Sequence, residues 1–135
     1  MATGVLGTPA RQDPRQVSNT LKKIVNWNDA AVGVALPLAN YLPQGAFIIG
    51  CWVEVVTAFT GTAPTLVVGT NATTYNNIVA AGDVTWTAAA VTPVSRPLGR
   101  SLTAAADVLA FAMLGGTPTA GQAIVVIEFE GGWSS

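Results

Sequence analysis

Histidine is absent from this chain of 135 residues, and cysteine occurs once, as Cys51. Without histidine the sequence cannot hold a Ser-His-Asp or Cys-His nucleophilic site, nor a histidine-based metal centre. A single cysteine also excludes a disulfide within the chain. Because no histidine is present to activate Cys51, which falls in an apolar segment, we expect a buried and unreactive thiol. These absences favour a protein that is not an enzyme and needs no cofactor.

Charge is also scarce: Lys, Arg, Asp and Glu make up 10% of the chain, against about 25% in an ordinary globular protein. With a net charge of -1, the chain lacks the clustered cations that nucleic-acid binding requires. Half of the residues are hydrophobic, so charged side chains cannot cover an isolated monomer in the usual way. We infer that protein partners cover part of the surface.

Long apolar runs are missing too. Gln44 and Glu54 bracket the most hydrophobic window, which is shorter than the ~20 residues that a membrane span needs. The N-terminus has no charged start followed by an apolar block, so we expect no secretory signal. The sequence therefore predicts synthesis in a cytoplasm and no membrane partner.

The strongest pattern present is an apolar alternation over residues 46–59, AFIIGCWVEVVTAF. A period of two predicts a long β-strand with one core face and one half-covered face. Trp52 and Glu54 fall on the half-covered face, and Gly50 is the expected place of a bend or bulge. The predicted core face comprises Phe47, Ile49, Cys51, Val53, Val55, Thr57 and Phe59.

Shorter strands and turns are predicted in the rest of the chain. The predicted strands are residues 21–27, 31–36, 65–69, 78–82, 83–87, 91–94 and 123–130. Residues 102–113 fit both a helical stripe and a strand, and we favour a strand from about Asp107 because the glycine-rich turn GGTPTAG and another strand follow. In the last strand Val125, Ile127 and Phe129 are expected to face the core.

Seven to nine strands with frequent turns predict an all-β protein, a jelly-roll-like antiparallel β-sandwich with an extended N-terminal arm. Residues 1–20 contain Pro and Gly without periodicity and are predicted to form a flexible arm. Residues 21–130 form the predicted sandwich domain, and residues 131–135 a flexible C-terminal tail. The segments GTAPT and GTPT resemble one another, which we interpret as recurring turn chemistry and not as a repeat.

Two sets of acidic residues are candidate chemical sites. Glu128 and Glu130 share one strand face about 6.6 Å apart at the backbone, which falls within the ~6.5–9.5 Å carboxyl spacing of inverting glycosidases. Charges that protect the end of a strand explain the pair more simply. Asp83 and Asp107 are candidate calcium ligands, although the sequence contains no calcium-loop spacing.

A sugar-stacking platform is a further alternative, at Tyr75 beside Asn71, Asn76 and Asn77. An exposed aromatic ring flanked by amides is suited to stacking on a sugar and binding its hydroxyls. Asparagines that form turns explain the same cluster more simply.

An interface with protein partners is the remaining candidate site. Four of the six Lys and Arg residues lie before residue 24, so the positive charge is local. Trp52 on the half-covered strand face is a candidate interface anchor, and Trp133 is poorly placed for a core. The candidate interface residues are Arg11, Arg15, Lys22, Lys23, Trp52 and Trp133.

A family resemblance rests on three segments: PLANYLPQGAFIIGCWVEVVTAFTGTAPTLVVGTN, NIVAAGDV and GGTPTAGQAIVVIEFE. Between about Pro37 and Glu130 the chain resembles head decoration (cement) proteins of tailed bacteriophages, such as the jelly-roll cement protein of the Bordetella phage. The shared motifs are turn and strand motifs. The resemblance implies a jelly roll on the outer surface of the icosahedral head, made in the cytoplasm of the bacterial host.

What the resemblance implies about partners is also specific. The protein would bind the major capsid protein and itself, as a dimer or trimer, and would stabilise the expanded capsid with no small-molecule substrate. Independently of the resemblance, the basic arm is suited to bind an acidic capsid surface through Arg11 and Arg15. The alternative function is a carbohydrate-binding jelly-roll module of a phage tail or head fibre.

Overall fold

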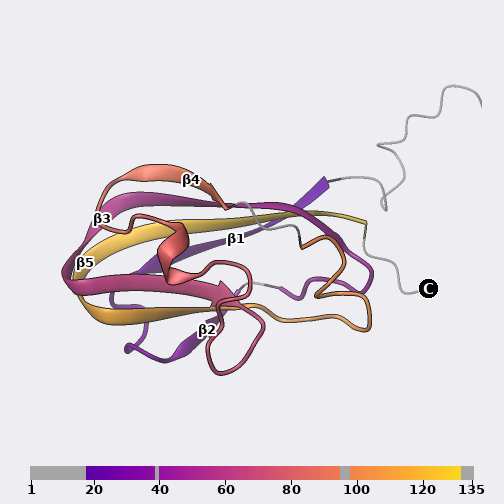
Figure 1. Ribbon diagram of the computed structural model, residues 1–135, viewed down its shortest axis with the longest axis horizontal. Coiled ribbons are helices and arrows are strands. Elements are labelled where there is room, and N and C mark those ends of the chain that lie inside the picture. The colour runs from indigo at the N-terminus through magenta and orange to yellow at the C-terminus, as the bar shows by residue number, and fades with distance from the viewer. Residues whose placement is uncertain (1–17, 39, 95–97, 132–135) are drawn as a thin grey trace, which may run out of the picture.

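The computed structural model describes residues 18–38, 40–94 and 98–131, and the regular secondary structure of this part is almost entirely antiparallel β-sheet (Figure 1). It contains five strands, fewer and longer than the sequence predicts, and the 3-10 turn η2 (Ala81–Asp83). The strands are β1 (Ser18–Asn26), β2 (Ala35–Pro37), β3 (Phe47–Gly69), β4 (Ala90–Val94) and β5 (Phe111–Glu130). No helix among these residues is long and apolar enough to cross a membrane.

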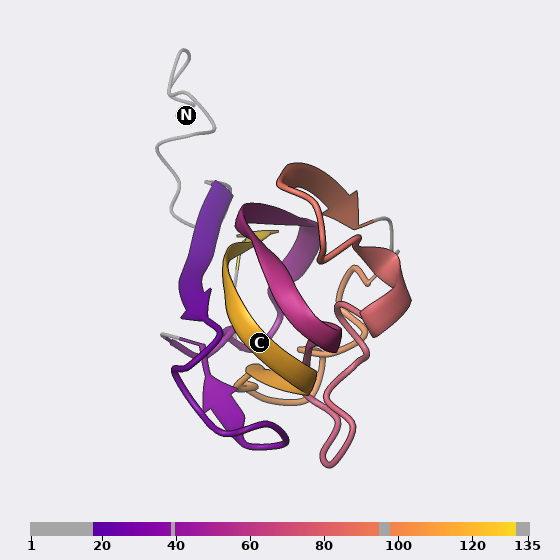
Figure 2. The ribbon, with the colours of Figure 1, turned by 90° about the vertical axis from the view of Figure 1, so that its left-hand side faces the viewer.

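Strands β3 and β5 pair along nearly their whole lengths and form a long ribbon that bends back on itself (Figure 1). One half of the ribbon contains the start of β3 and the end of β5, and it is flanked by β1 and β4 in the order β1-β5-β3-β4. Strand β2 pairs with the start of β5, in the other half. Viewed towards the bend, the ribbon halves and their flanking strands enclose the core (Figure 2). The predicted jelly-roll-like, all-β architecture is confirmed.

The bend lies where GTAPT of β3 meets GGTPT of β5. Gly61 is opposite Pro118 and Thr62 is opposite Thr117, with several register shifts between Val55 and Thr65. Gly61 and Gly116 have positive φ, and a Cβ on either would collide with a carbonyl oxygen of the opposite strand. The predicted turn over 60–65 and the predicted hairpin turn at GGTPTAG are therefore wrong: both segments continue their strands, and the two similar motifs pair with each other.

A bulge at Gly50 decides which residues of β3 face the core. The register shifts between Ile48 and Gly50, as the sequence predicts. An extra residue inverts the alternation, so Ile48 is buried while Phe47 and Ile49 are 53% and 45% exposed. The core prediction is confirmed for Cys51, Val53, Val55 and Phe59, and it is wrong for Phe47, Ile49 and Thr57.

Of the remaining predicted strands, some form in the structure and others do not. The predicted strands at 21–27 and 91–94 correspond to β1 and the edge strand β4. Residues 31–36 contribute only Ala35 and Leu36 to β2, and Val32 and Val34 are exposed. Residues 78–87 form no strand, only the isolated bridge from Val79 to Val68, followed by η2.

Residues 102–113 are not helical, but the strand that we favour from about Asp107 is correct only from Phe111 onwards. Val108 forms an isolated bridge with Leu42, and β5 begins at Phe111. In β5, Val125, Ile127 and Phe129 are buried as predicted.

The core fills the space between the ribbon halves. The Phe59 and Trp86 rings pack edge to face with centroids 6.0 Å apart, and the Trp86 indole Nε1 donates a hydrogen bond to the carbonyl oxygen of Ala81. Among the described residues, Thr103 is the buried polar side chain, and its hydroxyl donates to the carbonyl oxygen of Ala46.

Candidate interaction surface

The four-strand half of the sheet presents an outward face with an apolar centre, here called the front surface. In one row across the strands, Lys22 lies beside Val126, which lies beside Trp52, which lies beside Pro93. In the next row the neighbours are Ile24, Ile124, Glu54 and Val91. The first and last strands contribute exposed apolar side chains, with Ile24 at 45% and Val91 at 61% exposure. A contiguous face of this kind is typical of a protein–protein interface.

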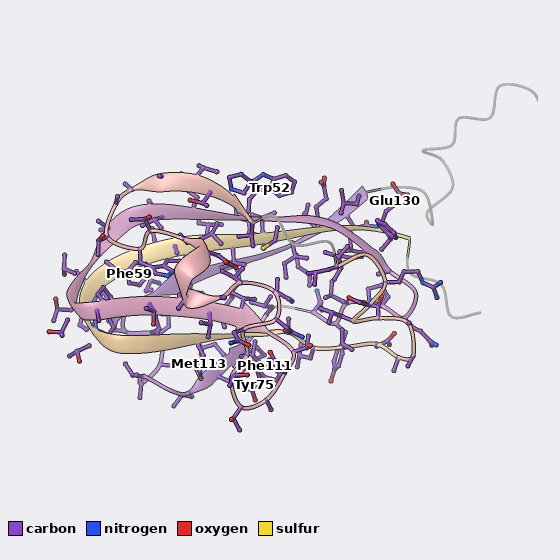
Figure 3. The ribbon with its side chains drawn as sticks, in the orientation of Figure 1. Trp52, Phe59, Tyr75, Phe111, Met113 and Glu130 are labelled. Carbon is purple, nitrogen blue, oxygen red and sulfur yellow. The ribbon has the colours of Figure 1, made fainter. Side chains whose placement is uncertain are left out.

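Gly50 positions Trp52 on this surface. A Cβ on Gly50 would lie 3.1 Å from Cη2 of the Trp52 ring, so the indole extends along the strand over the glycine. The side chain remains 37% exposed. Figure 3 shows Trp52 on the outer side of the ribbon, near the end of β4. A large, rigid, amphipathic ring held in this way is suited to anchor an interface.

The two predicted lysines do not share a face. Lys22 is exposed in the outward row of β1, whereas Lys23 falls on the opposite side of the strand, between the buried residues Leu21 and Val25. The alternation of a strand therefore brings Lys22 and Trp52 together on the front surface and separates Lys23 from them. Arg11, Arg15 and Trp133 lie outside the described residues, as do almost all of the predicted arm and tail.

A second apolar surface, here called the Tyr75 surface, lies on the other side of the molecule. It consists of Tyr75, Phe111, Met113 and Val67, and Figure 3 shows its labelled members on the side away from Trp52. Met113 pairs with Val67 of β3, and the Tyr75 and Phe111 rings are 5.2 Å apart. All four side chains are half-buried. The molecule thus carries apolar surfaces on opposite sides.

Asn71 organises the loop that carries Tyr75. Its side-chain oxygen accepts hydrogen bonds from the backbone N–H groups of Asn76 and Asn77, and its amide nitrogen donates to Thr74. The Asn77 side chain is bonded to Thr70. The asparagines therefore build the loop, and the Tyr75 ring packs on Phe111, so this arrangement does not favour the sugar-stacking alternative.

The acidic residues lie in separate places. Asp83 accepts a hydrogen bond from the backbone of Ala80, and Asp107 accepts one from the backbone of Gln44. The Asp83 carboxylate therefore stabilises its own loop, whereas the Asp107 carboxylate holds its loop to the loop of Gln44. Glu128 and Glu130 lie on the outward face of β5, towards its end. Within the described ranges, no group of three or more His, Cys, Asp and Glu side chains is placed to hold a metal ion.

Cys51 is buried on the core face of β3, as predicted. Desolvation raises the pKa of its thiol to about 12, and the negative charge of Asp83 adds to the effect. A thiol in this environment stays protonated and is a poor nucleophile.

Sequence reasoning found Trp52, Lys22 and the outward residues of β5, but it missed Ile24, Val91 and the Tyr75 surface. Alternation within β1 would have placed Ile24 on the outward face with Lys22. Val91 and the Tyr75 surface depend on which strands become neighbours, which no local pattern reveals.

Comparison with known proteins gives no relative by sequence: no protein-family model matches the chain, and no curated protein matches it. Solved structures do match by fold. A chain of the acidic stable capsid of Helicobacter pylori bacteriophage KHP30 has a TM-score of 0.59 and 17% identity, over 86% of this chain and 89% of that one.

Two further phage structures match similarly. A chain of the cyanophage Pam1 capsid asymmetric unit has a TM-score of 0.58 and 17% identity, over 84% of both chains. A chain of the Ralstonia phage GP4 capsid has a TM-score of 0.55 and 21% identity, over 87% of this chain and 86% of that one. At these identities the likeness shows a shared fold.

Proposed function

We propose that the protein is a structural protein of a phage virion, which binds the outside of an icosahedral head and cements neighbouring major capsid proteins. The observation that carries the proposal is the fold shared, over at least 84% of the chain, with chains from the capsids of three phages. Each match extends over nearly the whole of both chains, so the likeness concerns the complete sandwich and not a common submotif.

The placement of the two apolar surfaces supports a bridging role. A cement must contact at least two partners at once, and the front surface and the Tyr75 surface lie on opposite sides of the molecule (Figure 3). Both surfaces are rigidly built, since β-strands carry most of their residues and Trp52 and Tyr75 each pack against a neighbour. Rigid aromatic anchors lose little entropy on binding.

The composition supports burial against partners. Only 10% of the residues are charged, and ten large hydrophobic side chains among the described residues are exposed, including Tyr41 and Phe47. Such a surface is suited to a lattice in which many copies bind together, because avidity multiplies modest individual contacts. In this proposal Arg11 and Arg15 of the arm bind an acidic capsid surface.

Binding to undecorated capsids tests the proposal. The purified protein is mixed with expanded heads of its source phage that lack it, and the heads are sedimented. We expect saturable binding at a fixed ratio of copies to major capsid protein. Absence of binding, together with detection of the protein in separated tails or fibres by mass spectrometry, would overturn the proposal and favour a fibre module.

A further inference from the structure

We propose that the outer edge of β1 receives an extended, acidic segment of the major capsid protein, which joins the sheet as a further strand through backbone hydrogen bonds. The inference deepens the proposed function and rests on it, because the partner that it names is the capsid protein. It is carried by the place of β1 in the sheet, the direction of its backbone groups and its charge.

Strand β1 lies at the end of the sheet. It pairs with β5 over all nine of its residues without a register shift, and the strand order β1-β5-β3-β4 leaves its other side open. Figure 2 shows β1 at the margin of the sheet, with none of the described strands outside it. The sequence of β1, SNTLKKIVN, contains no proline. An edge of this kind is a template for pairing with another chain.

The direction of the backbone groups follows from a hydrogen bond just beyond the strand. The N–H of Trp27 donates to the carbonyl oxygen of Gly121 over 3.0 Å, and this pair continues the register of β1 with β5. Bonded and non-bonded pairs alternate along an antiparallel ladder. The odd-numbered residues of β1 therefore bond to β5, and the N–H and C=O groups of Thr20, Lys22 and Ile24 point away from it.

Asn26 shows the same direction and closes one end of the edge. Its N–H donates to the Asp29 carboxylate at 2.8 Å, and its carbonyl oxygen accepts a hydrogen bond from the Asp29 N–H at 3.1 Å. Within residues 18–38, 40–94 and 98–131, the backbone groups of Thr20, Lys22 and Ile24 have no comparable partner. These three residues define the open edge.

The opposite end of the sheet is protected. Strand β4 has five residues, and Pro93, which lies beside Trp52, is one of them. Proline has no N–H to donate, and in a sheet it occurs on edge strands with its nitrogen facing outwards. The two ends of the sheet therefore differ, and only the open edge of β1 presents N–H groups suited to accept a strand.

Charge selects the occupant of the open edge. Lys22 and Lys23 are adjacent, so they place cations on both faces of β1, and neither makes an ion pair with another described residue. A second copy fits poorly: Lys22 is the central residue of Ser18–Asn26, so full antiparallel pairing of two β1 strands would set Lys22 against Lys22. Like charges directly opposite are destabilising, whereas an acidic strand gains an attraction on each face.

The neighbouring β5 strand indicates where the partner's acids lie. Glu128 is the partner of Thr20 across β1 and β5, so that part of the front surface is already acidic. We therefore expect the acidic residues of the capsid segment beside the lysines. An apolar residue two positions away would lie on the same face, beside the exposed side chain of Ile24. The added strand would extend the front surface by about 4.8 Å.

Amide hydrogen exchange tests the pairing without any substitution. Exchange is measured at single residues by mass spectrometry, for the full chain free and bound to undecorated heads. In the free protein the amides of Thr20, Lys22 and Ile24 should exchange rapidly, and those of their odd-numbered neighbours slowly. On heads, the three open-edge amides should exchange at least about tenfold more slowly.

Proline substitution tests the same bonds through affinity. Thr20→Pro removes an outward N–H and leaves the bonds to β5 intact, so it should fold as wild type does and bind heads at least about tenfold more weakly. Thr20→Val keeps the N–H and should bind as wild type does. Lys23→Pro removes an N–H that bonds to β5 and should lower the unfolding temperature. Lys22→Glu should weaken head binding at least about tenfold.

The outcomes separate this inference from the proposed function. Wild type that binds heads with unchanged exchange at the open edge, or a Thr20→Pro or Lys22→Glu variant that binds as tightly as wild type, would overturn the inference and leave the proposed function standing. Protection of the open-edge amides already in the free protein would mean that the arm or a second copy occupies the edge, and would also overturn it. Wild type that does not bind heads would overturn both.

Discussion

Burial determines the chemistry of Cys51. Its folded pKa of about 12 lies above its ordinary value of 9.0, so the unfolded chain releases the thiol proton at lower pH than the folded chain does. The stability associated with the protonated thiol is therefore fully present below about pH 9 and falls as the pH rises towards 12. We expect no reaction with Ellman's reagent in the native state and one thiol after denaturation. Rapid labelling of the native protein would contradict this burial.

Thr103 makes a buried hydrogen bond to the carbonyl oxygen of Ala46. Replacing its hydroxyl by a methyl in Thr103→Val leaves that carbonyl without this donor, which should lower the free energy of unfolding by about 1–3 kcal/mol. Thr103→Ser retains the hydroxyl and serves as the control. Urea unfolding measures both, and a Val variant as stable as wild type would show that the hydrogen bond contributes nothing.

At the scale of elements, the bend of the β3–β5 ribbon depends on glycine for two separable reasons. Gly116 has φ +72°, and its missing Cβ leaves room for the Ala63 carbonyl. Two glycines outside the bend separate these reasons: Gly33 has φ +83° but open space around it, and Gly82 has open space and no positive φ. Gly116→Ala should cost about 2 kcal/mol or more, Gly33→Ala about 1 kcal/mol, and Gly82→Ala close to zero.

Thermal and urea unfolding of the three variants gives this ranking directly. Equal costs at Gly116 and Gly33 would mean that only the backbone angle matters at the bend, and that the close approach of the two strands does not.

The same bend shows what local sequence patterns can and cannot predict. Alternation identified the cores of β3 and β5, and Gly50 marked its bulge, because side-chain period and glycine are local signals. GTAPT and GGTPT also have the composition of turns, yet they form bent strands because each supplies the other's partner. That pairing joins residues more than fifty positions apart, and nothing within either segment encodes it.

Part of the candidate site could likewise be predicted from the sequence, and part could not. Trp52 was predictable because its own strand places it outward, and Lys22 because positive charge is concentrated before residue 24. Their joint position with Val126 and Val91 required the strand order β1-β5-β3-β4, and the Tyr75 surface required the loop over Gly69 that Asn71 and Asn77 hold in place.

At the scale of the whole molecule, Trp27 is a matched control for Trp52. Trp52 and Trp27 are 37% and 39% exposed, but Trp52 lies on the front surface and Trp27 lies beside Val32 and Pro118, near the bend. Trp52→Ala should weaken binding to heads about thirtyfold, because a central aromatic anchor of the interface is lost. Trp27→Ala should leave head binding unchanged, and equal effects of the two substitutions would show that the front surface does not bind the head.

Electron cryomicroscopy of heads with and without the protein tests the central claim most directly. We expect the difference map to show density for the sandwich on the outer surface of the shell, in contact with at least two major capsid proteins. Identical head maps, or added density confined to tail or fibre, would contradict the claim that this protein cements the head.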